Sequence, residues 1–167
     1  LNGVSKAYCM TGWRLGYCGG PKEIIAGMNK IQSQSNTSTS SISMAAAVEA
    51  LNGSQSFINN HNIQFKNRRD MVVKKLNEIE GITCSTPSGA FYVYPGCKGI
   101  IGKKTQSGEI IDSDEKFMNY LLESEGVAGV HGEAFGLSPY FRLSYATSEK
   151  VLEEACSRIA RACRSLR

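Results

Sequence analysis

Two basic residues near the start of the chain have the types and spacing that carbonyl chemistry beside an anion requires. Lys6 precedes Arg14 by eight residues, and Gly12 and Gly16 bracket the arginine. A lysine amine can form a Schiff base with a carbonyl compound, and an arginine is a permanently charged ligand for phosphate. Glycines beside it would let the backbone approach closely. The segment therefore predicts aldehyde capture beside a bound anion.

Pyridoxal 5'-phosphate is the cofactor that this pair fits best. It carries an aldehyde and a phosphate on one rigid ring and is commonly bound through a lysine. A surface lysine followed by a turn and a strand with a paired arginine would give the same pattern. Residue types and spacing alone leave both interpretations open.

The whole segment at residues 5–17 reads S-K-A-Y-C-M-T-G-W-R-L-G-Y. It closely resembles the cofactor-lysine motif of class I/II aminotransferases, in particular the bacterial and plastid type of aspartate aminotransferase. The resemblance implies that Lys6 binds pyridoxal 5'-phosphate covalently and is the catalytic base and acid. It also implies that Arg14 binds the cofactor phosphate. The spacing assigns no role to Tyr8 or Tyr17.

Three further segments resemble motifs of the same family in the same order. They are P-S-G-A-F-Y-V-Y-P at residues 87–95, V-H-G-E-A-F-G at 130–136 and Y-F-R-L-S-Y-A at 140–146. The last implies that Arg142 binds the substrate α-carboxylate. His131 stands where the family usually has proline. It is either a partly exposed turn residue or an added titrating group near the substrate.

The resemblance implies an α/β chain with the fold type I architecture of pyridoxal-phosphate-dependent transferases. Residues 1–62 would form the C-terminal end of the large cofactor-binding domain. Residues 63–167 would form the small C-terminal domain, including part of the long helix that connects the two. The chain would then be the C-terminal part of a longer enzyme, inactive alone because it lacks the rest of the cofactor site.

The implied reaction moves the amino group of L-aspartate, or a similar amino acid, to 2-oxoglutarate in a cytoplasmic homodimer. Prephenate, aromatic or kynurenine aminotransferases, and a regulator that binds the cofactor without turnover, are alternatives. Animal-type aspartate aminotransferases bind the distal carboxylate of the substrate with an arginine from the polar loop region. No arginine lies between Arg14 and Arg68, so this chain has no counterpart of that arginine in the polar loop region. A noncatalytic interaction module using a basic helix is the third alternative; its cluster comprises Arg68, Arg69, Lys74 and Lys75.

Composition argues against several other classes of protein. The net charge of +4 and the pI near 8.7 are mild, and solvated helix charges explain the basic cluster, so we expect no nucleic-acid partner. No apolar run approaches the ~20 residues that cross a bilayer, so no membrane partner is expected. The six cysteines include no C-x-x-C pair, which favours reduced thiols in the cytoplasm. With only two histidines, no metal site is expected.

Strand and helix patterns alternate along the chain, which favours an α/β fold. We expect a short buried strand at residues 15–18 and then a helix opened by Gly20-Pro21, with an inward apolar face comprising Ile24, Ile25, Met28 and Ile31. The polar stretch at 32–43 has the composition of a linker. In the resembled family this loop lies near the dimer interface and the neighbouring subunit's cofactor phosphate, which makes residues 35–39 a candidate supporting site. A capped apolar helix follows.

The second half of the chain continues this alternation. A long helix at 56–80 precedes strands at 82–84 and 90–94 and an exposed loop at 97–108. A helix capped by Ser113 and ended by Gly126 precedes strands at 127–130 and 140–145. Its expected inward side chains are Phe117, Tyr120, Leu121 and Leu122. The last helix begins near Ser148 and buries a stripe comprising Leu152, Ala155, Cys156, Ile159, Ala162, Cys163 and Leu166.

Overall fold

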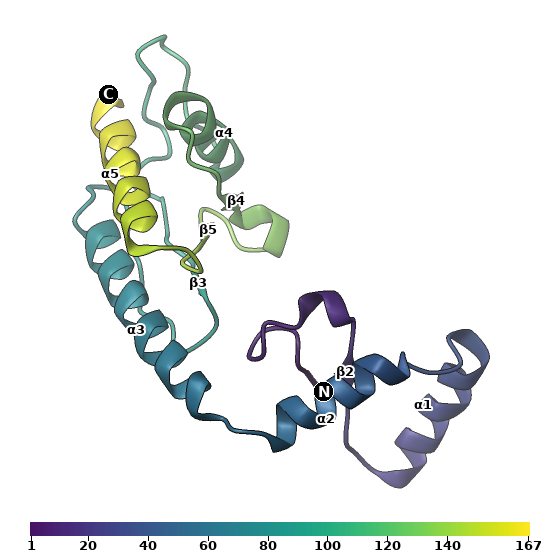
Figure 1. The fold of residues 1–167 in the computed structure, drawn as a ribbon. Coiled ribbons are helices and arrows are strands. Elements are labelled where there is room, and N and C mark those ends of the chain that lie inside the picture. The colour runs from purple at the N-terminus through teal and green to yellow at the C-terminus, as the bar shows by residue number, and fades with distance from the viewer. The chain divides into compact units, whose positions relative to one another are not determined.

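The computed structural model describes all 167 residues. The chain divides into two compact units, Leu1–Asn62 and Ile63–Arg167. Helix α3, Ser56–Asn77, contributes its first turns to unit 1 and the remainder to unit 2. Figure 1 labels the elements of both units along the chain.

Unit 1 combines a small strand pair with helices. Strands β1 (Asn2–Gly3) and β2 (Gly16–Tyr17) are antiparallel, with Gly3 opposite Gly16. The 3₁₀ turn η1 (Thr11–Trp13) lies between them. Helices α1 (Lys22–Ser35) and α2 (Ser41–Asn52) follow. The strand pair therefore closes residues 4–15 into a loop.

Two expectations for unit 1 are wrong. Strand β2 is present but exposed, with Tyr17 43% accessible. Helix α1 has no buried residue, and Ile24, Met28 and Ile31 are 59%, 42% and 72% exposed. Helical periodicity identifies an apolar face but not the surface that covers it, and nothing within unit 1 covers this one.

The polar stretch at residues 32–43 is not a linker throughout. Helix α1 continues to Ser35 and α2 begins at Ser41, so only residues 36–40 connect the two helices. Ser40 occupies the N-cap position of α2, but its side chain makes no capping hydrogen bond. Glutamine has a good helix propensity, and the neighbouring helical turns override the weaker propensity of serine.

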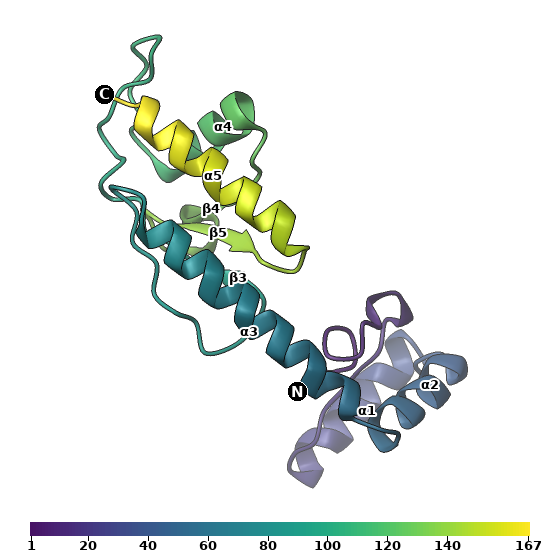
Figure 2. The same cartoon turned by 60° about the vertical axis from the view of Figure 1, so that its left-hand side comes forward.

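Unit 2 is a three-stranded antiparallel sheet packed with helices. Its strand order is β3 (Tyr92–Val93), β5 (Phe141–Ser144), β4 (Val130–His131). Helices α4 (Asp114–Glu125) and α5 (Glu149–Ser165) and the 3₁₀ turn η2 (Gly132–Phe135) complete it. Figures 1 and 2 show α5 running beside the unit 2 part of α3, where Lys75 and Glu153 form a 4.0 Å ion pair.

The core of unit 2 joins all of these elements. Its centre includes Leu76 of α3, Phe117 of α4, Phe141 of β5 and Ile159 of α5, each 0% exposed. Phe117 and Phe141 meet edge to face with ring centroids 5.6 Å apart. The predicted stripe of α5 is buried except for Ala155, which is half-buried.

The predicted ends of α4 and the predicted start of α5 are confirmed. Ser113 Oγ accepts a hydrogen bond from the Lys116 backbone N–H at 3.3 Å, and Gly126 ends α4 with φ of 65°. Ser148 Oγ accepts from the Val151 N–H at 3.4 Å at the start of α5. The expected inward position of Leu122 is wrong, because it is 53% exposed.

The segment at residues 97–108 is a loop with mostly exposed residues, as predicted, but buried residues anchor it to unit 2. Cys97 and Ile100 are 0% exposed, and Thr105 is 7% exposed. Backbone hydrogen bonds in both directions join Lys104 to Arg167, at 2.8 and 2.9 Å. The expected strand at 82–84 is only an isolated bridge from Thr83 to Gly96.

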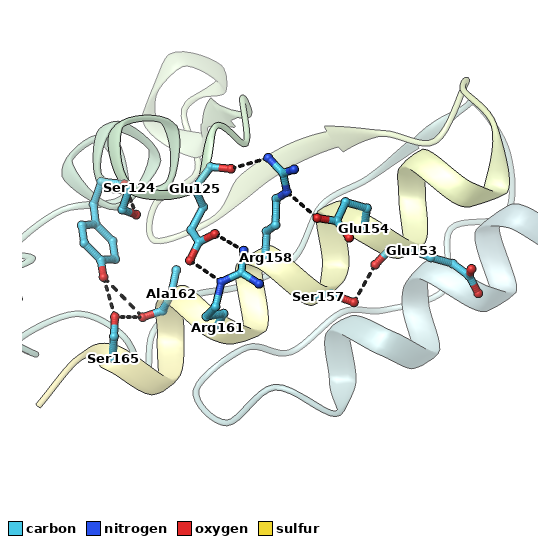
Figure 3. A network of polar contacts seen from close by, with 10 residues as sticks. Ser124, Glu125, Glu153, Glu154, Ser157, Arg158, Arg161, Ala162 and Ser165 are labelled. Carbon is cyan, nitrogen blue, oxygen red and sulfur yellow. Dashed lines mark hydrogen bonds and ion pairs between the residues drawn. The ribbon is translucent and has the colours of Figure 1, made fainter.

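A polar network joins the end of α4 to α5 (Figure 3). The Glu125 carboxylate accepts two hydrogen bonds from Arg161, and Arg158 Nη1 donates to the Glu125 carbonyl oxygen at 3.0 Å. Arg158 Nε also donates to Glu154 at 2.8 Å. Two arginines of α5 thus bind one residue at the C-terminus of α4, where cations are favoured.

Candidate active site

Lys6 and Arg14 lie in the loop that β1 and β2 close. Val4, at the start of this loop, is 0% exposed. Two side-chain hydrogen bonds tie the loop to the rest of unit 1: Ser43 Oγ of α2 donates to the Trp13 carbonyl oxygen at 2.9 Å, and Tyr8 OH donates to Gln55 Oε1 at 2.9 Å. The loop is therefore held at its ends and within its length.

The backbone of this loop adopts a conformation that is costly for side chains with a Cβ. Cys9 has φ of 55° and Arg14 has φ of 52°, both in the left-handed region. Such residues cost on the order of 1–3 kcal/mol each and cluster at functional sites. The loop contains two of the four non-glycine residues with positive φ in the chain, which marks it as a candidate site.

The side chains of Lys6 and Arg14 are both exposed. Arg14 Nη1 donates to the Thr11 carbonyl oxygen at 3.1 Å, and Arg14 makes no ion pair with a carboxylate. Its charge is therefore available to an anion. An amine and an unneutralised guanidinium in one anchored loop suit a ligand that carries an aldehyde and a phosphate, so the residues present fit pyridoxal 5'-phosphate.

A hollow of about 720 Å³ in unit 1 lies beside this strand pair. Gly16 and Tyr17 of β2 line one side, and Thr37, Ser38 and Thr39 of the α1–α2 connection line another. Thr37 has a left-handed φ of 65°. The structure thus places most of the candidate supporting residues 35–39 near the strand that follows Arg14.

Arg142 belongs to unit 2, on the central strand β5 opposite Val130. Its guanidinium carbon lies 4.4 Å from the ring centroid of Tyr92 and 4.5 Å from that of Phe135. The side chain is half-buried and makes no ion pair. Sequence reasoning missed both rings. The sequence held no signal for this arrangement, because only the β3–β5–β4 strand order brings both rings to Arg142.

His131 is half-buried at the end of β4, opposite Phe141, and immediately precedes η2. His131 is therefore a partly exposed residue beside a turn, which both interpretations of the sequence allow.

The basic stretch of α3 is paired in part within unit 2. Lys66 and Arg69 both contact the Asp70 carboxylate at 2.7 Å. Hydrogen bonds from Lys66 and then Arg69 hold the pKa of Asp70 below its ordinary value. Arg69 Nη1 also donates to the Pro87 carbonyl oxygen at 3.0 Å, and Lys75 pairs with Glu153. Arg68 lies over the Phe65 ring without a carboxylate partner, and Lys74 makes no ion pair, so two of the four cations of the cluster keep an uncompensated charge.

All six cysteines are free thiols, and four of them are buried. No group of three or more His, Cys, Asp or Glu side chains is placed to hold a metal ion. No helix has both the length and the apolar character that crossing a membrane would demand.

Comparison with known proteins gives consistent matches over nearly the whole chain. Residues 1–159 match the family "Aminotransferase class I and II". A probable aspartate/prephenate aminotransferase of Rhizobium leguminosarum bv. phaseoli is 60% identical over 98% of this chain and 41% of its own length. An aspartate/prephenate aminotransferase of Cereibacter sphaeroides is 56% identical over 99% of this chain and 41% of its own length.

The fold is likewise similar to solved structures. The crystal structure of the aspartate aminotransferase from Rhizobium meliloti matches with a TM-score of 0.96 and 57% identity, over 99% of this chain and 42% of that one. The chain thus spans about two fifths of the length of these relatives. Its α/β fold is that of the pyridoxal-phosphate-dependent aminotransferases, and the chain belongs to the aminotransferase class I and II family.

Proposed function

We propose that this chain is the C-terminal part of an aminotransferase that moves the amino group of L-aspartate to 2-oxoglutarate. The observation that carries this proposal is the anchored loop with Lys6 and the unneutralised Arg14, in a chain 60% identical to an aspartate/prephenate aminotransferase. Prephenate is the second candidate acceptor, because relatives at 60% and 56% identity carry it in their names.

Members of the family use pyridoxal 5'-phosphate, which when bound supplies an aldehyde for the amino group and an electron sink for the α-carbon. In this proposal Lys6 Nζ would hold the cofactor at its aldehyde, and Arg14 would hold its phosphate. Once the substrate amino group had replaced Lys6 at that aldehyde, the Lys6 amine would take and return the proton at the substrate α-carbon. Arg142 binds the α-carboxylate with two parallel hydrogen bonds and so orients the α-hydrogen.

We assign residues 1–62 to the end of a large cofactor-binding domain and 63–167 to a small domain. The exposed apolar side chains of α1 support the first assignment, because Ile24 and Ile31 need a covering surface that unit 1 does not supply. A chain of 167 residues alone would then be inactive. The complete enzyme is proposed to be a cytoplasmic homodimer, with residues 35–39 near the partner's phosphate site.

The test compares the full-length protein with its Lys6→Ala variant, each mixed with pyridoxal 5'-phosphate. We expect a visible absorbance band in the wild type that shifts on adding L-aspartate. Borohydride should attach the cofactor to the peptide that contains Lys6, as mass spectrometry would show. The variant should give neither the shift nor the labelled peptide. Labelling of another lysine in the wild type would refute the assignment.

A further inference from the structure

We propose that Tyr92 and Phe135 are positioning residues that hold the Arg142 guanidinium between their rings, so that its edge faces a substrate carboxylate. This inference deepens the proposed function and rests on it, since it takes Arg142 as the carboxylate ligand. We call the pair Tyr92 and Phe135 the aromatic clamp.

The two rings come from the elements on either side of the central strand. Tyr92 lies on β3 opposite Ser144, two residues along β5 from Arg142 and so on the same face. Phe135 ends η2, which directly follows β4 on the other side of β5. Each ring lies within 4.5 Å of the same guanidinium carbon, yet the two rings make no contact with each other. They therefore cover different sides of the group.

Phe135 is 49% exposed, but neighbouring aromatic residues and a constrained turn hold it in place. The Tyr94 ring meets it edge to face at 6.2 Å and stacks on Tyr140 at 5.6 Å. Tyr94 OH donates to the Gly132 carbonyl oxygen at 3.1 Å. Gly132 admits no side chain, because a Cβ there would lie 2.0 Å from the Leu137 carbonyl oxygen. The turn that carries Phe135 is thus tightly constrained.

The electrostatics distinguish this clamp from ordinary packing of a structural arginine. Arg69 and Arg161 both bind carboxylates, whereas Arg142 is half-buried, makes no ion pair and lies over two rings. Rings stabilise a cation over their faces without using its N–H donors. The in-plane donors of Arg142 therefore remain available for two parallel hydrogen bonds to a carboxylate.

Clamping also restricts the rotamers of a long side chain before the ligand arrives. Arginine loses substantial conformational freedom when it is immobilised by a ligand, and ordering it in advance lowers that cost on binding. The clamp should therefore strengthen carboxylate binding without taking part in proton transfer.

The experiment uses the full-length, cofactor-loaded protein and maleate, a dicarboxylate that has no amino group to react. Calorimetry would measure maleate Kd for the wild type, Tyr92→Leu and Phe135→Leu. Each cation–π contact at a partly exposed site implies about a 2- to 5-fold rise in Kd on its loss. The KM for L-aspartate should rise by a similar factor with kcat little changed. Tyr92→Phe and Phe135→Tyr keep the rings and should keep the wild-type Kd.

Leu137→Ala is the matched control, since Leu137 is 49% exposed, follows the same turn and has no ring over Arg142. Its Kd should equal that of the wild type. The clamp would be refuted, and the proposed function kept, if the leucine variants bound maleate as tightly as the wild type. The same would follow if the ring-retaining variants bound it as weakly as the leucine variants. A wild type that neither loads the cofactor nor binds maleate would refute the proposed function, and the clamp with it.

Discussion

The arginines of this chain differ in whether a carboxylate neutralises their charge, and that difference helps to identify ligand-binding candidates. Arg69 and Arg161 are bound by carboxylates of the same unit. Arg14 has one backbone carbonyl as its partner, and Arg142 has two rings. Arg68 likewise lies over a ring without a carboxylate partner, so the missing counter-ion does not single out Arg14 and Arg142 by itself. An arginine without a counter-ion keeps its charge for an anion, and the motif positions of Arg14 and Arg142 make these two the candidates for phosphate and carboxylate binding.

The buried cysteines provide a test at the same scale. Burial raises the pKa of Cys84 and Cys156 to about 11 and that of Cys97 and Cys163 to about 12. At pH 8 the thiolate fraction of each is then about one thousandth or less, and the thiolate is the reactive form. We expect iodoacetamide to leave all four unmodified in the folded protein at pH 8, as measured by peptide mass spectrometry.

In urea the same four thiols should react fully, because unfolding restores their ordinary pKa and exposes them. Raising the pH from 8 to 9 should speed labelling of the unfolded protein by about threefold, because the ordinary thiol pKa is about 8.5, while the folded protein stays unmodified. Rapid modification of Cys97 or Cys163 under native conditions would show that the core of unit 2 opens readily.

The motif residues and the clamp show what sequence could reveal at this scale. Lys6, Arg14 and Arg142 were found as candidates because a motif preserves them as residue types at fixed positions. Tyr92 and Phe135 were not found, because 43 residues separate them in the chain and only the β3–β5–β4 order brings both to Arg142. Periodicity reports the face on which a residue lies, not its neighbour across a sheet.

At the scale of elements, the sequence predicted helix ends reliably from capping residues, but it did not predict which segments are buried by distant parts of the chain. The limits of α4 and α5 follow from hydrogen bonds at Ser113 and Ser148 and from the left-handed backbone of Gly126, all of which are local chemistry. The burial of Ile100 in a segment rich in glycine and lysine depends on distant strands and helices, so composition predicted the exposed loop there but not this buried residue.

The connection between α4 and α5 should depend on the charge of Glu125. Its hydrogen bonds with Arg161 hold the pKa of Glu125 below its ordinary value. A depressed carboxyl pKa contributes stability above the ordinary pKa, and that contribution is lost as the pH falls through the folded-state pKa. We expect Glu125→Gln to lower the melting temperature by a few degrees at pH 7, and this difference to shrink steadily as the pH falls below the ordinary carboxyl pKa.

Glu123→Gln is the control for this experiment, because Glu123 lies on the same helix, is exposed and has no ion pair. Its melting temperature should follow that of the wild type at every pH. A difference between Glu125→Gln and the wild type that persists undiminished at acidic pH would mean that packing of the side chain, not its charge, joins the helices.

At the scale of the whole molecule, the two units differ in how completely they bury their apolar side chains. Unit 2 has a continuous core that draws on α3, α4, α5 and the sheet. In unit 1, the only buried apolar side chains are Val4 and Ala47, while Ile31 and Ile42 are each 72% exposed. Burial of apolar surface is the dominant favourable contribution to folding, so unit 2 should be far more stable than unit 1 in the chain by itself.

Hydrogen exchange would test this difference directly. In the 167-residue chain alone, amides of α5 should exchange slowly, because their opening requires disruption of the core. Amides of α1 should exchange orders of magnitude faster, since nothing buries that helix. In the full-length protein the proposed large domain would cover Ile24 and Ile31, so α1 should gain protection while α5 changes little. Equal protection of α1 and α5 in the short chain would contradict the assignment of unit 1 as part of a larger domain, because it would show that these apolar faces need no further surface.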